Sequence, residues 1–389
     1  MADPAPLWLV AGCMSVGPLA TNLYLDSLPH LARYFGTGAS AAQATLTVFV
    51  IGVGIAQLLA GPLADRFGRR PLALGGCLTY VLASVVCAVA PSMSILIVGR
   101  LLQALGCCSV LVAARTIIRD RYAPAQGAAV IARASSLLAF VPLFGPALGG
   151  YTQVWWGWRA AFVIHALCAA LLLVAGLRWL RETHAAPDAD ALRPARFVRA
   201  YADIARSRAF WDFALPGALT YAAIFVFIAG SSFAFIEVLG VPTERYGLCF
   251  AFAVCGYLLG TLACRRLVPR LGLSRVLRIG TALTLLGGGG LCVLVVADVA
   301  HWAVLLAAQF IVMTAHGLNQ PCAQAGVVAP FAARAGAAAG LFGFLTMTIA
   351  LAVGTALGVL HDDTLRPLAG LSALVGMLAC WAGWRSPRT

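Results

Sequence analysis

The chain has 389 residues, of which 61% are hydrophobic and only 11% are charged. Soluble domains carry about 25% charged residues, so this composition excludes a soluble protein and indicates a chain whose solvent is lipid. Only helices and closed barrels can span a bilayer. Continuous apolar runs of roughly 20 residues, without an alternating pattern, favour helices over a barrel. We therefore predict an all-α membrane protein that is embedded in the lipid bilayer.

The formal net charge is +13, and every one of the 27 residues counted as Lys or Arg is arginine. These arginines are scattered between apolar runs and form no basic patch with interleaved aromatic residues, so we expect no nucleic-acid partner. The 12 cysteines fall mostly inside apolar runs and lack CxxC or Cys/His metal spacing. We expect neither disulfides nor a bound metal, and no other cofactor.

The chain contains twelve apolar segments that are long enough to span a membrane. In chain order they cover about 7–27, 43–61, 71–90, 95–117, 129–151, 160–180, 213–235, 247–265, 276–297, 302–322, 337–359 and 367–384. With the N-terminus inside, 20 arginines fall in cytoplasmic segments and four in the opposite loops. Because positive charge is enriched on the inner side of a membrane, this bias places both termini in the cytoplasm.

A polar stretch near the middle of the chain divides the spans into six and six. We predict an N-terminal half over residues 1–182, a cytoplasmic central linker over 183–211 and a C-terminal half over 212–389. A basic segment inside the linker, Arg193–Arg208, either lies along the inner membrane surface or is a solvated connection.

Two short matches between the halves indicate an internal repeat. GPLADR at Gly61–Arg66 resembles GTLACR at Gly260–Arg265, and GPALGG at Gly145–Gly150 resembles GTALGV at Gly354–Val359. Each match falls in the corresponding span of its half. Parallel repeats of six spans are typical of transporters that bind substrate between the halves near the membrane midplane.

Three motifs resemble those of the major facilitator superfamily. GPLADRFGRR at Gly61–Arg70 is similar to the family signature between the second and third helices. GRLLQALG at Gly99–Gly106 resembles its fourth-helix motif, and GPALGG at Gly145–Gly150 resembles the motif of its drug/proton antiporters. The resemblance implies twelve membrane helices in two pseudo-symmetric six-helix halves.

Further short matches are more specific. Tyr24-Leu25 with Leu28-Pro29, Ile236-Glu237-Val238 with Gly240-Val241, and Leu360-His361-Asp362 are similar to the bicyclomycin/chloramphenicol-resistance group of that superfamily. The resemblance implies a proton-coupled exporter of small, often amphipathic molecules in the bacterial inner membrane. It also implies that the protein works by alternating access, without nucleotide hydrolysis, and can act as a monomer.

The charged hairpin between the second and third spans is the candidate gate. We read it as a very short loop whose gating residues are Gly61, Asp65, Arg66, Gly68, Arg69 and Arg70. Asp65 can accept bonds from a neighbouring helix N-terminus, or pair with Arg115 or Arg119 at the inner end of the fourth span. Either contact would latch the two halves, whereas the alternative is an ordinary positive-inside loop.

Asp26 and Arg100 are the candidates for proton coupling. The related group usually has an acid at the position of Asn22, which cannot ionise, whereas Asp26 lies four residues further on and one helical turn outward. Arg100 lies at a similar depth in the fourth span, where a charge is costly unless it is paired or lines a water-filled cavity. Asp26 and Arg100 either form a pair that proton uptake breaks, or Asp26 lies in the outer interface and Arg100 snorkels.

The antiporter motif and several polar or aromatic side chains complete the predicted site. Gly145, Pro146, Gly149 and Gly150 have the spacing of closely packed helices. The candidates for lining a substrate cavity are Asn22, Tyr24, Gln103, Tyr221, Phe225, Asn319 and Gln320. His165 and His316 are more typical of packed histidines than of proton carriers.

Two other functions have to be weighed against drug export. The missing first-span acid leaves open a proton-linked transporter of a metabolite, such as an amino acid or a nucleoside. An intramembrane enzyme would need a nucleophile with a base, or paired acids, inside the spans. The sequence shows no GxSxG, HExxH or P-loop pattern, which disfavours an enzyme.

Overall fold

The computed structural model describes residues 7–121, 140–183, 191, 193–299 and 301–385. Within these ranges the regular elements are all helical, and eleven helices are long and apolar enough to cross a membrane. The fifth predicted span, 129–151, lies partly outside the described residues, and its described part belongs to α7 (Phe140–Trp156). The predicted all-α membrane fold is confirmed.

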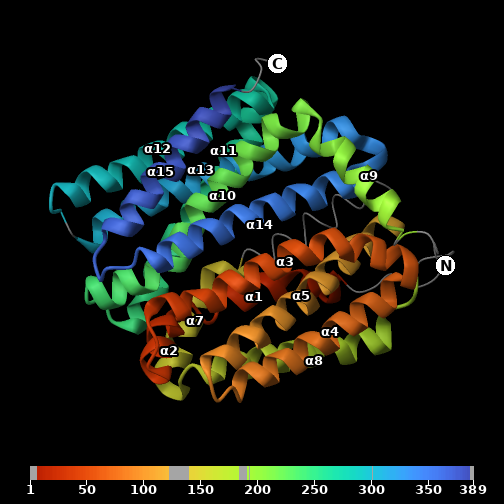
Figure 1. Ribbon diagram of the computed structural model, residues 1–389, viewed down its shortest axis with the longest axis horizontal. Helices are drawn as coiled ribbons and strands as arrows, with labels where there is room; N and C mark the ends of the chain where they lie inside the picture. The colour runs from red at the N-terminus through yellow and green to blue at the C-terminus, as the bar shows by residue number, and fades with distance from the viewer. Residues whose placement is uncertain (1–6, 122–139, 184–190, 192, 300, 386–389) are drawn as a thin grey trace.

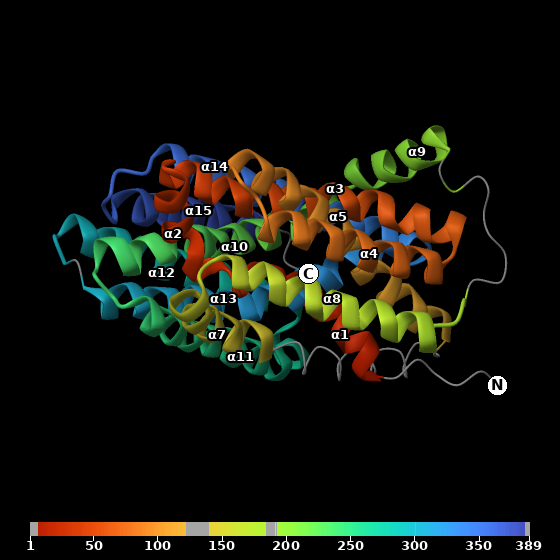
Figure 2. The ribbon, with the colours of Figure 1, turned by 90° about the horizontal axis from the view of Figure 1, so that it is seen from below.

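The N-terminal half forms one bundle, drawn from red to yellow-green in Figure 1. Besides α7, its elements are α1 (Leu7–Asn22), the 3-10 turn η1 (Leu25–Ser27), α2 (Leu28–Phe35), α3 (Ala39–Phe67), α4 (Arg69–Ala88), α5 (Met93–Arg121) and α8 (Arg159–Trp179). The helix α9 (Pro194–Ala205) follows and lies at one end of the molecule, where it projects from the bundles in Figure 2.

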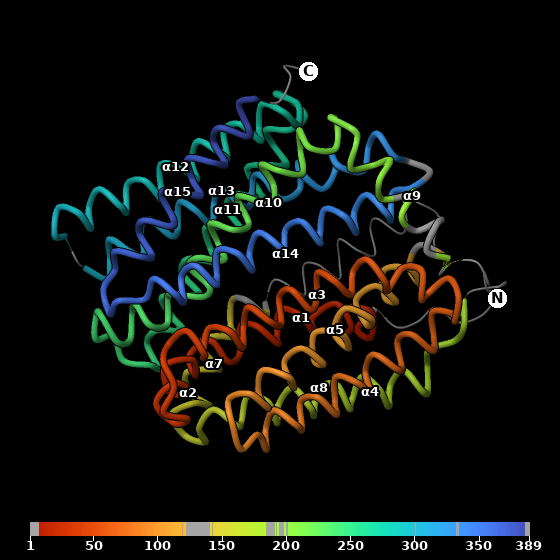
Figure 3. Tube along the Cα trace, in the orientation of Figure 1, coloured from red at the N-terminus to blue at the C-terminus, as the bar shows by residue number. Residues whose placement is uncertain are grey.

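The C-terminal half forms the second bundle, drawn from green to blue. Its elements are α10 (Arg208–Ser232), the π-helix η2 (Phe233–Val238), α11 (Thr243–Leu271), α12 (Leu273–Val296), α13 (Trp302–Val328), the 3-10 helix η3 (Ala329–Arg334), α14 (Ala335–Val359) and α15 (Arg366–Arg385). The two bundles meet along α3 against α14, which run side by side in Figure 3, and along α7 against α11.

The first span is not the continuous helix that the sequence predicts over residues 7–27. The helix α1 ends at Asn22, the chain turns through η1, and a new helix begins at Leu28. Pro29 lies in the first turn of α2, where its missing N–H group has no helical partner to lose, so it favours a new start over continuation. Asn22 and Asp26 therefore do not lie on one helical face.

The charged hairpin also differs from the predicted loop. The helix α3 continues through most of the motif to Phe67, and a single residue, Gly68, separates it from α4. Gly68 has φ +97°, a conformation that side chains disfavour. Gly272, with φ +77°, joins α11 to α12 in the same way in the other half. The two halves thus share a one-glycine junction between their second and third long helices.

The central linker packs against both bundles through α9. The Tyr201 hydroxyl donates to the Leu58 carbonyl of α3 at 3.3 Å, and Asp203 pairs with Arg334, just before α14, at 2.8 Å. Ile204 is fully buried. The described part of the basic segment therefore lies against the protein rather than forming a solvated connection.

Helices of the C-terminal bundle approach each other at glycines. A Cβ added at Gly260 of α11 would meet the Thr314 carbonyl and lie 2.9 Å from the Gly317 Cα of α13. Helices surrounded by lipid gain association energy from such close packing, because no hydrophobic force pushes them together. The repeat match at Gly260–Arg265 thus includes a contact on which this bundle depends.

Gly260→Ala is expected to destabilise the protein, since the added methyl group must push α11 away from α13. Overpacking of this kind costs about 1–3 kcal/mol. Gly290→Ala in α12 is the control, because no atom lies within 4 Å of its added Cβ. The measurement is the midpoint of thermal unfolding in detergent, followed by tryptophan fluorescence. Equal midpoints for both variants would contradict the close contact.

Candidate functional site

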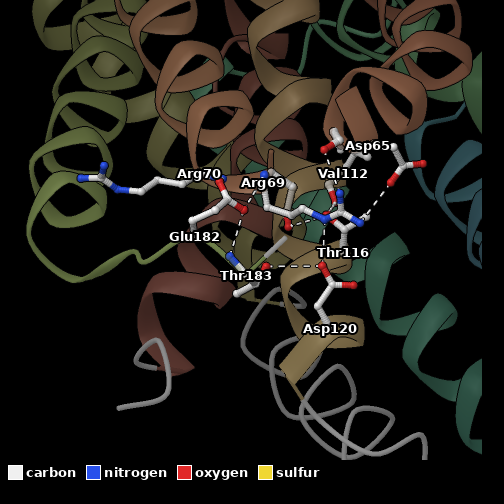
Figure 4. Close-up of polar contacts among 10 residues, drawn as sticks. Asp65, Arg69, Arg70, Val112, Thr116, Asp120, Glu182 and Thr183 are labelled. Atoms are coloured by element: carbon white, nitrogen blue, oxygen red, sulfur yellow. Dashed lines mark hydrogen bonds and ion pairs between the residues drawn. The ribbon is translucent and has the colours of Figure 1, made fainter. Parts of the chain in front are cut away.

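Arg69 is the centre of a polar network at the end of the N-terminal bundle that carries the charged hairpin. Its side chain is only 3% exposed. The guanidinium pairs with Asp65 at 3.0 Å, with Asp120 of α5 at 2.8 Å, and donates to the Ala64 carbonyl at 2.8 Å. Figure 4 shows these partners converging on Arg69 from α3 and α5. A buried arginine is stable here because charged and polar acceptors surround it.

Glu182, just after α8, completes this network and was not predicted as a site residue. Its two carboxylate oxygens accept the backbone N–H groups of Arg69 and Arg70, each at 3.0 Å (Figure 4). These are the first amides of α4, which have no partner inside the helix. A carboxylate at this position also opposes the positive end of the helix dipole. Glu182 therefore caps α4 from 113 residues away along the chain.

Arg70 makes a second link between the start of α4 and the end of α8. Its guanidinium donates to the carbonyls of Leu180 and Leu177, at 2.8 and 3.3 Å, near the C-terminal end of α8. Arginine at a helix C-terminus satisfies the free carbonyls and favours the negative end of the dipole. Glu182 and Arg70 thus exchange complementary caps between α4 and α8.

The structure bears on only part of the expected latch. Asp65 pairs with Arg69, and the described bonds of Arg69 and Arg70 join helices of the N-terminal bundle. Arg115 is exposed on α5 and forms no ion pair with Asp65 in the part of the chain that the structure describes. The side chain of Arg119 lies outside the described residues, so its pairing stays a prediction.

The remaining gating residues have simpler surroundings. Arg66 is exposed, with its guanidinium 5.6 Å from the centre of the Phe67 ring. A Cβ added at Gly61 would meet no atom within 4 Å, so Gly61 is not required by packing in this arrangement. Gly68 is required by its backbone conformation.

Arg100 is fully buried inside the N-terminal bundle. Its Nε donates to the Thr45 carbonyl at 3.3 Å and its Nη1 to Gln103 Oε1 at 2.5 Å. The rings of Tyr24 and Phe49 each lie with their centres 4.3 Å from the guanidinium carbon. Cation–π contacts and hydrogen bonds replace part of the water that this charge has lost, while Nη2 has no hydrogen-bond partner among the described residues.

Asp26 is also fully buried, but its carboxylate oxygens have no hydrogen-bond partner among the described residues. The predicted pair with Arg100 does not form in this structure, because Arg100 is held by Thr45, Gln103 and the aromatic rings. The physical reason is the break after Asn22, which removes Asp26 from the helical face that the prediction assumed. An unpaired carboxylate at such a position is costly when charged, whereas the neutral acid is tolerated.

The antiporter motif forms the surroundings of Asp26. A Cβ added at Gly149 of α7 would lie 2.6 Å from Asp26 Oδ2 and would also meet the Leu23 carbonyl. At Gly150, it would lie 2.9 Å from the Thr243 carbonyl and 3.4 Å from Asp26 Oδ1. Asp26 therefore lies where η1, α7 and the start of α11 meet, at the boundary between the two halves.

Two further motif residues extend this boundary along α7. An added Cβ at Gly145 would lie 3.1 Å from the Asn22 Cβ, and Pro146 contributes backbone against Gly247 of α11. At Gly247 an added Cβ would lie 2.5 Å from the Ala147 nitrogen. The helix α7 is thus held between the first span on one side and α11 on the other.

Polar contacts close the same end of the molecule between the halves. Arg33 of α2 pairs with Glu237 of η2 at 3.3 Å, and His30 Nε2 lies 3.4 Å from the Thr243 hydroxyl. Both pairs consist of residues that lie close in the sequence to Asp26 or to the start of α11, which meet at this boundary. We call the region formed by η1, α2, α7, η2 and the first turns of α11 the outer junction, because the orientation predicted from the arginines would place it on the outer side.

Three of the predicted cavity residues use their polar groups in contacts within their own bundle. The Tyr24 hydroxyl lies 3.1 Å from the Thr45 hydroxyl, and Gln103 bonds to Arg100 and, at 2.7 Å, to Ser84. With its amide oriented to satisfy both groups, Asn319 donates to the Leu277 carbonyl at 3.0 Å and accepts from the Thr281 amide at 3.2 Å. Their polar groups are already satisfied in this arrangement.

The other predicted cavity residues make fewer polar contacts with neighbouring helices. Asn22 donates to the Pro18 carbonyl of its own helix at 2.7 Å. The Phe225 ring lies near Gly354 of α14, where Thr47 of α3 also approaches. Gln320 is half-buried, and its side-chain carbonyl oxygen has no partner among the described residues.

An aromatic group in the C-terminal bundle surrounds a histidine. His316 of α13 lies with its ring centre 5.8 Å from the rings of Tyr221 in α10 and Tyr257 in α11. Tyr221 stacks in turn on Phe225, with centres 6.4 Å apart. His316 is 6% exposed, and its Nδ1 has no hydrogen-bond partner in the described part of the chain. We call these four residues the aromatic group.

Comparisons with known proteins match the fold and the motifs together. The family model described as the Major Facilitator Superfamily matches residues 10–355. A chloramphenicol resistance protein of Pseudomonas aeruginosa is 33% identical over 275 residues, which cover 69% of this chain and 63% of that protein. Multidrug resistance protein D of Escherichia coli K12 is 28% identical over 95% of this chain and 92% of its own.

Solved structures agree on the fold at lower sequence similarity. A peptide transporter POT in complex with sulfate superposes with a TM-score of 0.78 at 15% identity, covering 98% of this chain and 93% of that one. A D-xylose–proton symporter gives 0.76 at 15% identity, with coverage of 98% and 97%. At such identities the likeness establishes the arrangement of helices alone.

Glu182→Ala is expected to destabilise the N-terminal bundle, because two amides of α4 lose their acceptor. Loss of a helix cap costs about 1 kcal/mol. Glu182→Gln keeps one acceptor oxygen and is expected to fall between the Ala variant and the unaltered protein. Arg181→Ala, an exposed neighbour, serves as the control in the same thermal-unfolding measurement. A Glu182→Ala midpoint no lower than that of Arg181→Ala would contradict the capping role.

Proposed function

Because the chain belongs to the major facilitator superfamily, we propose that it is a proton-coupled exporter of small amphipathic molecules. The relatives named for chloramphenicol, bicyclomycin and multidrug resistance support export of drug-like compounds. The arginine bias supports a bacterial inner-membrane location with both termini in the cytoplasm. The outer junction then faces away from the cytoplasm, and α9 lies on the cytoplasmic side.

Transport proceeds by rocking of the halves, residues 1–182 against residues 212–389, around a site between them. The linker 183–211 connects the moving halves. Closure at the outer junction, with the Arg33–Glu237 and His30–Thr243 contacts formed, corresponds to a state that blocks the outer side. One buried cluster is shared by the two halves, and each half also has a cluster of its own. Because a single chain supplies both halves, it can carry out the cycle as a monomer.

The observation that carries proton coupling is the buried, unpartnered carboxyl of Asp26 in the outer junction. In the closed junction the neutral acid is favoured, because no donor or cation compensates a charge there. When the junction opens, Asp26 meets outer water and can exchange its proton. Proton uptake from outside therefore permits closure. Release of the proton requires water to reach Asp26 from the inner side once the halves have rocked, and the restored charge then favours reopening with substrate bound.

Asp26 takes over the role of the missing acid at Asn22. The break after Asn22 carries Asp26 into the junction, where its protonation acts directly on the contact of η1 with α7 and α11. Arg100 acts differently, since its bond to the Thr45 carbonyl joins α5 to α3 and its guanidinium packs against the Phe49 ring. We propose that it positions the first span without binding the transported proton.

The aromatic group supplies the substrate contacts on the C-terminal side. Planar faces of Tyr221, Tyr257 and Phe225 suit the apolar part of an amphipathic molecule. The free Nδ1 of His316 and the free oxygen of Gln320 suit its polar part. No acidic side chain belongs to this group, which favours neutral substrates over cations.

Asp26→Asn is expected to abolish substrate-driven pH change in everted membrane vesicles, because the amide mimics the protonated acid and cannot release a proton. Downhill movement of a neutral substrate should continue. Asp298→Asn is the matched control: Asp298 is exposed at a loop, and asparagine readily adopts its φ of +56°. Unaltered proton flux in Asp26→Asn would remove this residue as the carrier.

Tyr221→Ala is expected to raise the substrate KM about two- to tenfold, since one stacking contact contributes about 0.5–1.5 kcal/mol. Phe252→Ala is the control, because Phe252 of α11 is 52% exposed on the outside of the bundle. The readout is initial transport velocity against concentration for an aromatic and a non-aromatic neutral drug. Equal effects of both variants would place the binding site elsewhere.

A further inference from the structure

A surface groove of about 540 Å³ lies between the first half of α12 and the end of α15. Its walls include Ile279, Leu283, Leu286 and Trp384, with Arg275 and Arg278 at one end. The groove lies on the outside of the C-terminal bundle, away from the outer junction and the aromatic group.

The apolar part of this groove faces lipid. Ile279 is 40% exposed, Leu286 60% and Trp384 62%. Eleven residues of helix separate Arg275 from Leu286, which corresponds to about 16 Å at 1.5 Å per residue. This length is close to half of the ~30 Å hydrocarbon core of a bilayer. The groove therefore has about the length of one leaflet.

The polar end of the groove is positively charged. Arg275 and Arg278 are three residues apart and share one helical face. Arg275 is exposed, and Arg278 is oriented by a 3.4 Å bond from its Nε to the Gly383 carbonyl. None of the residues that line the groove is acidic. Trp384 lies at the same end, where tryptophan is typical of the membrane–water interface.

We propose that this groove binds an anionic phospholipid of the leaflet it faces. One acyl chain lies along Ile279, Leu283 and Leu286, and the phosphate is bound by Arg275 and Arg278. An anionic head group adds net negative charge at this basic end, whereas a zwitterionic lipid carries its own ammonium group beside the phosphate. Basic pockets between membrane helices are typical binding sites for anionic head groups.

The test is native mass spectrometry of the full chain in detergent, titrated with phosphatidylglycerol or with phosphatidylcholine of the same acyl chains. We expect phosphatidylglycerol to bind about tenfold more tightly. The double variant Arg275→Gln/Arg278→Gln should lose this preference. The matched control is Arg265→Gln/Arg266→Gln. It removes two exposed arginines near the C-terminal end of α11, which do not line the groove.

A third variant separates a bound lipid from simple attraction of phosphate to surface charge. Ala282 is exposed in the wall of the groove, so Ala282→Trp fills the acyl-chain space while both arginines remain. This variant should bind phosphatidylglycerol about tenfold more weakly and still attract inorganic phosphate as before.

Three outcomes would overturn the proposal. The first is equal affinity for the two lipids in the unaltered protein. The second is an equal loss in the groove and control double variants. The third is full binding of phosphatidylglycerol to Ala282→Trp, or its displacement by inorganic phosphate alone.

Discussion

The outer junction depends on backbone contact that only glycine permits. At Gly149 the chain of η1 is so close that an added methyl group would touch Asp26, and at Gly247 it would touch the backbone of α7. In lipid, this close approach is the main source of helix association. The position of the first span, the closure of this end and the dryness around Asp26 all follow from it.

Two buried ionisable groups, Asp26 and Arg100, lie in the N-terminal half without pairing, and their surroundings differ in kind. Arg100 has a carbonyl, an amide oxygen and two aromatic faces around its guanidinium, although its Nη2 has no hydrogen-bond partner among the described residues. Asp26 has none of these contacts. A charge with such partners stabilises one arrangement, whereas a group that is tolerated only when protonated makes the arrangement depend on the proton. This contrast separates a structural residue from a candidate carrier.

Hydropathy and arginine bias predict the architecture because the bilayer imposes it on every span alike. The predictions from sequence are wrong at positions where tertiary contacts decide where a helix begins or ends. A helix ends at Asn22 because Pro29 starts another and α7 fills the space beside the turn, and no local pattern contains α7. The hairpin is nearly all helix because Gly68 alone makes the turn and distant Glu182 caps the next helix. A glutamate 113 residues away gives no signal beside the motif it serves.

The π-helix at the end of α10 gives the outer junction a second way to change. At its end the Leu239 N–H donates to the Ala234 carbonyl five residues back, as in a π-helix, so one residue more than an α-helix needs is wound into the turn. Rewinding to α-helix would advance the following residues by one position, which corresponds to a rotation of about 100°. Glu237 would then turn away from Arg33. A change of register within one turn would therefore break the Arg33–Glu237 pair that joins the two halves.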